Sequence, residues 1–124
     1  MFVLFDHNKV VPADLGTNFF VRPEAIGADR AGEVAANLVD LNSDVKVSVE
    51  TRNPLDVIEH DLEKLGSFDM VLTSGLPESH LRRLAAFLYE RGIPFLNVDL
   101  HGFIACMRLA VPEHTGASLS CGLI

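Results

Sequence analysis

The chain has 124 residues, a hydrophobic fraction of 48%, a charged fraction of 22% and a formal net charge of -7. This composition is typical of one folded domain and excludes an intrinsically disordered chain, which would be poorer in apolar residues. The 10 Lys and Arg residues are dispersed along the chain beside 17 acidic residues, which argues against a nucleic-acid partner and favours a protein partner.

The two cysteines lie far apart and form no CxxC pair, which disfavours a disulfide framework and a zinc site. Cys106 lies in an apolar run, Ile-Ala-Cys-Met-Arg, and is expected to be a buried, inert thiol. The apolar start of the chain is too short to span a membrane and lacks the basic residues of a signal peptide. We therefore expect an intracellular protein, cytoplasmic or nuclear, with no membrane partner.

Phe2 to Phe5 form a short apolar run that predicts a buried strand. Asp6, His7 and Asn8 follow it, at the carboxyl edge of a presumed parallel sheet, where ligands bind in open α/β folds. Asp6 has two interpretations that the sequence does not separate. It is either a ligand-binding carboxylate or a side chain that caps the turn toward Val10.

A turn-rich connection, Pro12 to Gly16, precedes two neighbouring aromatic residues, Phe19 and Phe20. A soluble domain does not leave two large rings exposed without a reason. They are expected to fill either the core of the domain or an interface with a partner.

The next segments alternate between helical and strand periodicity. Apolar residues at spacings of three and four predict a helix from about Asp29 to Leu41, and alternation predicts an edge strand over Val45 to Val49. A short acidic helix is expected over Leu55 to Leu65, with His60 on its solvated surface.

Met70, Val71 and Leu72 form an unbroken apolar run, which predicts a mid-sheet strand buried on both faces. The turn from Thr73 to Glu78 follows it and is the place where a nucleotide site would lie. Pro77 is expected at the first helical position of an amphipathic helix that ends near Gly92.

Two further strands are expected, Ile93 to Val98 and Ile104 to Val111, with a turn over Asp99 to Phe103. A connection this short cannot make a parallel crossover, so this last pair is predicted to be antiparallel and the sheet to be mixed. Residues 118–124 show no clear pattern and are expected to fray.

The chemistry-bearing motifs of common enzymes are missing from the sequence. A nucleotide site in an α/β fold needs a Gly-rich turn between a first strand and a helix, and no such turn is present. The histidines form no HxxxH pair and no Ser lies in a Gly-x-Ser-x-Gly elbow. Metal hydrolase and serine hydrolase functions are therefore disfavoured, and we expect neither a catalytic residue nor a metal site.

Six short segments together resemble one known family. They are 4–10 (Leu-Phe-Asp-His-Asn-Lys-Val), 14–21 (Asp-Leu-Gly-Thr-Asn-Phe-Phe-Val), 26–31 (Ile-Gly-Ala-Asp-Arg-Ala), 41–45 (Leu-Asn-Ser-Asp-Val), 76–79 (Leu-Pro-Glu-Ser) and 107–115 (Met-Arg with Glu-His-Thr). In this order and spacing they resemble the ThiF/MoeB-like adenylation domain of ubiquitin-like-protein activating enzymes. Within that family they are most similar to the regulatory, catalytically silent branch of the neddylation-activating heterodimers. A weaker match is the corresponding SUMO-activating branch.

The resemblance implies a degraded ATP site. Asp6 matches the ribose-binding Asp of active members, and Arg30 takes the place of a basic residue that contacts ATP. The Asn-Arg-Gln of active members is replaced by the stretch 16–18 (Gly-Thr-Asn), which removes an Arg that would offset phosphate charge. Pro77 replaces a magnesium-binding Asp, so a metal ligand is missing unless Glu78 substitutes for it. No cofactor is therefore expected here, and ATP and magnesium are expected in a partner subunit.

The resemblance also implies the fold, a truncated Rossmann-like α/β mixed sheet with flanking helices and antiparallel strands at the C-terminal end. The expected domain covers residues 1–117, followed by an irregular tail, 118–124. The family's first strand, Gly-rich turn and first helix precede the equivalent of Phe2, so two central strand edges are expected to lack a neighbour. The sequence leaves open whether the chain is a fragment, an isoform or a degenerate copy.

The expected function is that of a regulatory, non-catalytic subunit, or a remnant of one, that docks onto a catalytic adenylating subunit and acts indirectly on a ubiquitin-like modifier. Phe19 and Phe20 are the expected interface residues. One alternative is a reduced nucleotide-binding enzyme that uses Asp6, Arg30 and Glu78. Another is an α/β domain with no present function.

Overall fold

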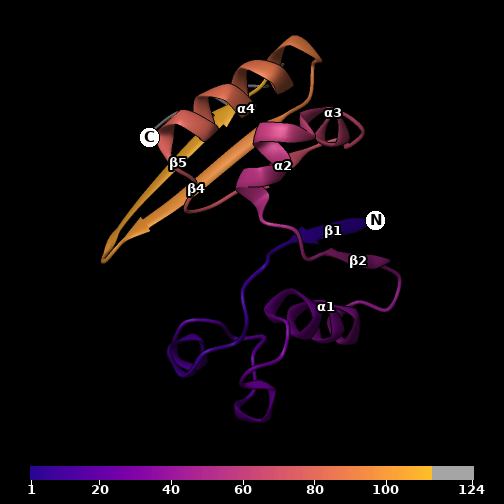
Figure 1. Cartoon of the computed structure of the whole chain (residues 1–124), viewed down its shortest axis with the longest axis vertical. Helices are drawn as coiled ribbons and strands as arrows, with labels where there is room; N and C mark the ends of the chain where they lie inside the picture. Colours follow the sequence, from indigo (N-terminus) through magenta and orange to yellow (C-terminus); the bar gives the residue numbers. More distant parts are fainter. Residues whose placement is uncertain (113–124) are drawn as a thin grey trace, which may run out of the picture. The chain divides into compact units, whose positions relative to one another are not determined.

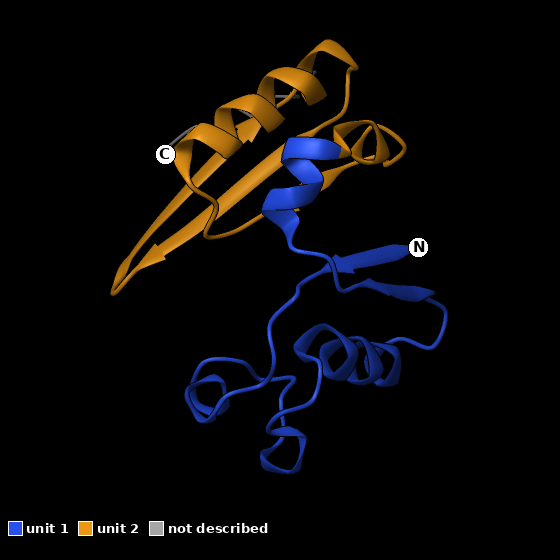
Figure 2. Ribbon diagram, viewed as in Figure 1, with its two compact units in different colours: residues 1–60 blue, residues 61–124 orange. Residues whose placement is uncertain are grey.

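The structure is a computed structural model that describes residues 1–112 of the chain (Figure 1). The chain divides into two compact units, Met1–His60 and a second unit that begins at Asp61 (Figure 2). Cys121, the expected tail and the domain boundary at residue 117 lie outside the described residues. No helix within residues 1–112 is long and apolar enough to cross a membrane.

Unit 1 contains a two-stranded parallel sheet, one long helix and several short helical turns. Its elements are β1 (Phe2–Phe5), the 3-10 turns η1 (Pro12–Gly16) and η2 (Pro23–Ala25), α1 (Arg30–Leu41), β2 (Val47–Glu50) and α2 (Pro54–His60). β1 and β2 pair in parallel, with Phe2 opposite Val47 and Phe5 opposite Glu50. The predicted strand over Phe2 to Phe5 and the helix that was expected from about residue 29 are therefore confirmed as elements. The strand was expected to be buried, but Phe2 is exposed and the other three residues are only partly buried.

The core of unit 1 lies where the irregular segment between β1 and α1 packs against α1. Val10, Val21 and Ala25 are buried there, and Val34 of α1 packs against them. Backbone hydrogen bonds join Val10 to the stretch just before α1 in both directions, Val10 N–H to Ala28 O at 2.9 Å and Gly27 N–H to Val10 O at 2.9 Å. Residues 8–10 are thereby fixed beside the N-terminus of α1.

The single helix predicted over Leu55 to Leu65 is wrong in one respect. Asp61 has φ -140° and ψ 41°, which is not helical, and it separates α2 from a short helix α3 (Leu62–Leu65). Asp disfavours helix interiors and favours helix starts, so the interruption falls where its propensity predicts. Val57 and Ile58 are buried as expected, and His60 is exposed.

Unit 2 is built on a mixed three-stranded sheet in the order β3-β4-β5. Besides α3 its elements are β3 (Val71–Thr73), α4 (Glu78–Glu90), β4 (Phe95–His101) and β5 (Ile104–Ala110). β3 and β4 are parallel, and β4 and β5 are antiparallel. The mixed α/β class and the antiparallel C-terminal pair are therefore confirmed, although the described strands form two sheets.

The helix α4 covers one face of this sheet. Its apolar side chains Leu81, Leu84 and Leu88 are buried, and the ion pair of Glu78 with Arg108, 3.2 Å long, joins the start of α4 to β5. Pro77 lies immediately before the first helical residue, one position earlier than predicted.

The opposite face of the sheet, called the open face here, carries only apolar side chains. The strand register places them in rows, Leu72 with Leu96 and Leu109, Val98 with Met107, and Leu100 with Ala105. Leu72 of β3 is 64% exposed. The prediction of a mid-sheet strand buried on both faces is therefore wrong, because β4 is the only strand within residues 1–112 that pairs with β3.

Two expectations for the last strands also need correction. The turn predicted over Asp99 to Phe103 is too long, since β4 continues to His101 and only Gly102 and Phe103 connect it to β5. Gly102 has φ +64°, which a glycine adopts at little cost in a tight hairpin. Cys106 was expected to be buried, but it is exposed because β5 is an edge strand of the described sheet.

Candidate functional site

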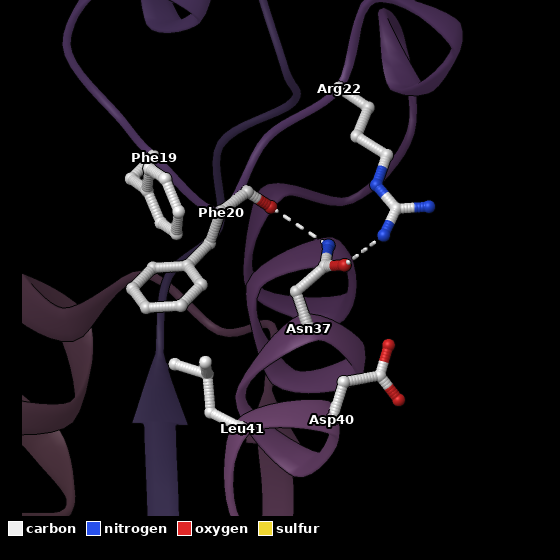
Figure 3. Close-up of a pocket in the computed structure, with 6 residues that line it drawn as sticks. All are labelled: Phe19, Phe20, Arg22, Asn37, Asp40 and Leu41. Atoms are coloured by element: carbon white, nitrogen blue, oxygen red, sulfur yellow. Dashed lines mark hydrogen bonds between the residues drawn. The ribbon is translucent and has the colours of Figure 1, made fainter.

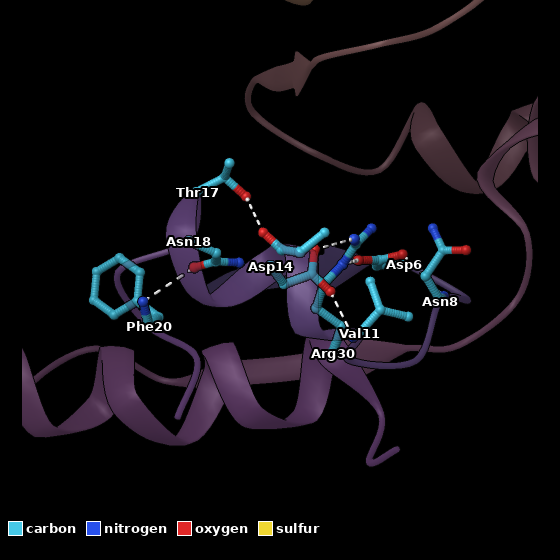
Figure 4. A network of polar contacts seen from close by, with 9 residues as sticks. Asp6, Asn8, Val11, Asp14, Thr17, Asn18, Phe20 and Arg30 are labelled. Atoms are coloured by element: carbon cyan, nitrogen blue, oxygen red, sulfur yellow. Dashed lines mark hydrogen bonds and ion pairs between the residues drawn. The ribbon is translucent and has the colours of Figure 1, made fainter. Parts of the chain in front are cut away.

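The carboxyl end of β1 lies beside the first residue of α1, and this contact brings the two predicted ATP-site positions together (Figure 4). Arg30 Nε donates a hydrogen bond of 2.6 Å to Asp6 Oδ2. The backbone of the same two segments is also joined, since Arg30 N–H donates to Asn8 O at 3.0 Å. This backbone hydrogen bond holds the start of α1 beside the residues that follow β1, and it thereby places Arg30 next to Asp6.

Asp6 also caps its own turn. The Asn8 N–H donates to Asp6 Oδ1 at 3.0 Å, while Asp6 Oδ2 accepts from Arg30. The two interpretations of Asp6 that the sequence left open are thus not exclusive, because one oxygen holds the turn and the other holds the guanidinium.

A third member of the cluster, Asp14, was missed by the sequence reasoning. Arg30 Nη1 donates to Asp14 Oδ1 at 3.1 Å, and the Val11 N–H donates to Asp14 Oδ2 at 2.8 Å. Asp14 is only 9% exposed. A signal for it exists in the sequence, since Asp two residues after Pro12 is placed to bond the backbone at the start of a helical turn.

The pKa values of the three groups are shifted in the directions expected for ion pairs. Those of the carboxyl groups of Asp6 and Asp14 are lowered, and that of the Arg30 guanidinium is raised. Partial burial of Asp6 tends to raise its pKa, but the hydrogen bonds from Arg30 and Asn8 together outweigh it, and the pKa of Asp6 is lowered. The pKa of Asp14 is lowered by the Val11 N–H and then by Arg30, against burial. The pKa of Arg30 is raised, chiefly by Asp6.

In this arrangement the polar groups of Asp6 and Arg30 are bonded within the chain. Both Asp6 oxygens accept hydrogen bonds, and the guanidinium of Arg30 is shared between two carboxylates of its own chain. In the stretch Gly16 to Asn18, the Asn18 side chain accepts from the Phe20 N–H at 3.0 Å. The assignment of Asp6 and Arg30 as vestigial ATP-site positions remains a prediction.

Phe19 and Phe20 form an edge-to-face pair with ring centroids 5.4 Å apart (Figure 3). Phe19 is 89% exposed, so it is no part of a core formed by residues 1–112, whereas Phe20 is half-buried. Asn37 of α1 fixes the segment, because its Nδ2 donates to Phe20 O at 2.9 Å and its Oδ1 accepts from Arg22 at 3.0 Å. The two rings, with Arg22, Asn37, Asp40 and Leu41, line an open pocket.

The turn after β3, where a nucleotide site would lie, is held by a second polar network. Thr73 Oγ1 donates to Asn97 Oδ1 at 2.9 Å, and Asn97 Nδ2 donates to Asp99 Oδ2 at 2.6 Å. Asp99 Oδ1 accepts from the Gly75 N–H at 2.8 Å, where Gly75 has φ +70°. Asn97 is 1% exposed, so its amide is used to fix the turn and not to contact a ligand.

Glu78, the only replacement magnesium ligand that the sequence suggested, is held by two cations. Its Oε1 accepts from Arg82 Nε at 3.0 Å, and its Oε2 pairs with Arg108 at 3.2 Å. The hydrogen bond from Arg82 is the largest cause of its lowered pKa. Within residues 1–112 no group of three or more His, Cys, Asp or Glu side chains is placed to hold a metal ion.

The curated proteins to which the sequence is similar include several named NEDD8-activating enzyme E1 regulatory subunit. It is 41% identical over 114 residues to the NEDD8-activating enzyme E1 regulatory subunit of Danio rerio, covering 92% of this chain and 21% of that protein. It is 38% identical over 115 residues to the protein of the same name from Xenopus laevis, covering 93% of this chain and 22% of that protein. The chain thus spans about a fifth of the length of these relatives.

Comparison with solved structures gives the fold. The crystal structure of E. coli MccB with ATP superimposes with a TM-score of 0.79 at 22% sequence identity, covering 92% of this chain and 34% of that one. The identity is low, so this likeness supports the Rossmann-like architecture alone. No family model matches the chain.

Proposed function

The chain is homologous to one part of the NEDD8-activating enzyme E1 regulatory subunits, and on that premise we propose that it acts as a regulatory, catalytically silent subunit in protein neddylation. In this proposal it docks onto the catalytic adenylating subunit, which binds ATP and magnesium, and so reaches the ubiquitin-like modifier only indirectly. A cytoplasmic or nuclear location follows from the same proposal.

The observation that carries the proposal is the homology itself, at 41% identity over 92% of the chain. Because the chain spans only about a fifth of that relative, it would supply one part of the regulatory subunit and not its whole activity. The relatives reported above are both named for NEDD8, which favours the neddylation pathway over the SUMO alternative.

The side-chain contacts support catalytic silence. An adenylation site needs a positive charge that is free to meet the phosphates as they gain charge. Arg30 is instead committed to Asp6 and Asp14, with distances of 2.6 and 3.1 Å. A reduced nucleotide-binding enzyme built on Asp6, Arg30 and Glu78 would have to break these ion pairs, as well as those of Glu78, before it could bind a nucleotide.

The exposed ring of Phe19 supports docking through the segment after η1. A ring that is 89% exposed gains free energy when a partner covers it, and aromatic residues are enriched among the residues that dominate binding energy. The edge-to-face contact with Phe20 and the hydrogen bonds of Asn37 hold this segment in a defined conformation. Less conformational freedom is therefore lost on binding.

Binding to a purified catalytic subunit of NEDD8-activating enzyme tests the proposal directly. We expect saturable binding, and we expect Phe19→Ala to raise the Kd by about thirtyfold, which corresponds to a hot-spot loss of about 2 kcal/mol. Tyr89→Ala is the matched control, because Tyr89 is an exposed aromatic residue of α4 in the other unit.

The same preparation tests catalytic silence. The chain alone should give no ATP-dependent pyrophosphate exchange above a heat-inactivated control, and the mixture should give no more than the catalytic subunit and its own modifier support. Exchange by the isolated chain would overturn the silent role. Absence of binding to the catalytic subunit by the folded chain would overturn the docking role.

A further inference from the structure

The outer edge of β5 is the longest strand edge without a neighbour in the described part of the chain. β5 pairs along all seven residues with β4, and no strand within residues 1–112 pairs with its other side (Figure 1). Ile104 to Leu109 are all exposed, and Met107 at the centre of the strand is 70% exposed. Such an edge presents a row of backbone N–H and C=O groups to any other extended strand.

The residues of β5 do not protect this edge. Natural edge strands are usually shielded by Lys, Pro, a bulge or short length. β2 fits that description, since it has four residues, ends at Glu50 and follows Lys46. β5 has seven residues, with neither Pro, Gly nor Lys, and its one charge, Arg108, is held by Glu78 on the α4 side of the sheet.

We propose that β5 pairs edge to edge, antiparallel, with β5 of a second copy of this chain, in a register centred on Met107. Two neighbouring strands related by a two-fold axis perpendicular to the sheet are antiparallel, and a two-fold interface presents the same patch twice. The two three-stranded sheets would then join into one continuous sheet. This contact is separate from the proposed docking to a catalytic subunit through Phe19.

The centre of the register follows from length and charge. Because β5 runs from Ile104 to Ala110, centring on Met107 is the only choice that pairs every residue of the strand. Ala105 then faces Leu109 of the second copy on the open face, and Arg108 faces Cys106 on the α4 side. A register centred on Arg108 would instead place two guanidinium groups opposite each other, and like charges directly opposite destabilise a sheet.

The open face explains why a second copy fits better than a charged partner. Its side chains are all apolar, so pairing through β5 extends one apolar face into the same apolar face of the second copy. A charged strand would bring uncompensated charges beside Leu109 and Met107, with a cost in desolvation. Pairing of two β5 strands centred on Met107 brings no charged side chain to the open face.

Sedimentation velocity of the isolated full chain, from micromolar to several hundred micromolar, tests the association. We expect a monomer–dimer equilibrium, and Met107→Lys should raise the dimer Kd by about tenfold, because it places two like charges opposite each other at the centre of the register. Tyr89→Lys makes the same charge change at an exposed site on α4 and should leave the Kd unchanged. A chain that stays monomeric throughout, or a dimer equally weakened by both variants, overturns the proposal.

Cysteine cross-linking tests the register even if Met107→Lys folds poorly. In a background with Cys106→Ser and Cys121→Ser, Met107→Cys should form an intermolecular disulfide on mild oxidation, because directly opposite residues have Cα atoms about 4.5 to 5.5 Å apart. Ala105→Cys, on the same face, would lie four residues from its equivalent and should not cross-link. Equal cross-linking of both variants, or of neither, contradicts the Met107-centred dimer.

No catalytic subunit is present in these two measurements. A failure here therefore leaves the proposed regulatory role intact, and a failure of docking to the catalytic subunit leaves this proposal intact.

Discussion

Unit 1 and unit 2 use their polar and apolar residues in opposite ways. At the carboxyl end of β1, unit 1 holds one arginine between two carboxylates, and each group of this ion-pair cluster (Asp6, Asp14 and Arg30) is satisfied within the chain. Unit 2 covers one face of its sheet with α4, and on the other face Leu72, Leu100, Met107 and Leu109 are exposed. In the first unit the polar side chains bond one another, and in the second unit apolar side chains remain exposed.

The two units are therefore stabilised by different interactions. Ion pairs and hydrogen bonds fix the carboxyl end of β1 in unit 1, whereas apolar packing under α4 stabilises unit 2. The two units should therefore respond differently to substitution and to pH.

The largest effect is expected from the covered face of unit 2. Leu88 is fully buried on α4, and Leu88→Ala should lower the free energy of unfolding by about 2 to 5 kcal/mol, because it removes buried methyl groups and leaves a cavity. Urea unfolding followed by circular dichroism gives the value. Met107→Ala on the open face is the control and should change it by less than about 0.5 kcal/mol at low protein concentration. Equal losses would mean that the two faces are equally packed.

Arg30→Met should have the next largest effect, confined to unit 1. The substitution leaves Asp6 and Asp14 without their cation, and hydrogen bonds to charged groups contribute about 1.5 to 3 kcal/mol. Hydrogen exchange should show faster opening of α1, with α4 unchanged. Arg22→Met is the control, because Arg22 is an exposed arginine whose partner Asn37 is neutral. It should raise the hydrogen-exchange rate of α1 far less than Arg30→Met does. If both variants behave alike, the ion-pair cluster does not stabilise unit 1.

The pH dependence of unit 1 follows from the lowered pKa values of Asp6 and Asp14. A carboxyl group with a lower pKa in the folded than in the unfolded state binds fewer protons when folded. It therefore stabilises the fold above its unfolded pKa of about 3.9, and this contribution is lost as pH falls through the folded pKa.

Stability of α1 to hydrogen exchange should accordingly decline below about pH 5 in the natural chain. The decline should be shallower in Asp6→Asn and in Arg30→Met, because each removes a favourable contact of the ionised carboxylate. An unchanged slope in both variants would show that other carboxylates set the acid sensitivity.

The smallest effects are expected at the two aromatic rings, measured in the isolated chain. Phe20 is half-buried and its replacement by Ala should cost about 1 to 2 kcal/mol, less than the 3 to 5 of a fully buried Phe. Phe19→Ala should cost less than about 0.5 kcal/mol, because the ring is 89% exposed. A larger loss for Phe19 than for Phe20 would make Phe19 a structural residue and remove the reason to place it at an interface.

Local patterns predicted the elements well where one rule decided the outcome. The helix of Arg30–Leu41 followed from apolar residues at spacings of three and four, and the antiparallel β4–β5 pair followed from a connection too short for a crossover. The sequence also located the pair Asp6 and Arg30, but through a family resemblance and not through spacing, because the two residues are 24 positions apart.

The sequence by itself determined the α/β class and the order of the elements, since propensity and periodicity are local properties of the chain. Tertiary structure alone decided that Asp14 joins the cluster, that Leu72 and Cys106 are exposed, and that β5 is an edge strand. An apolar run such as Met70 to Leu72 has the same sequence pattern whether or not another strand or helix packs against it. Burial depends on which elements pack together, and packing is settled only when distant segments meet in space.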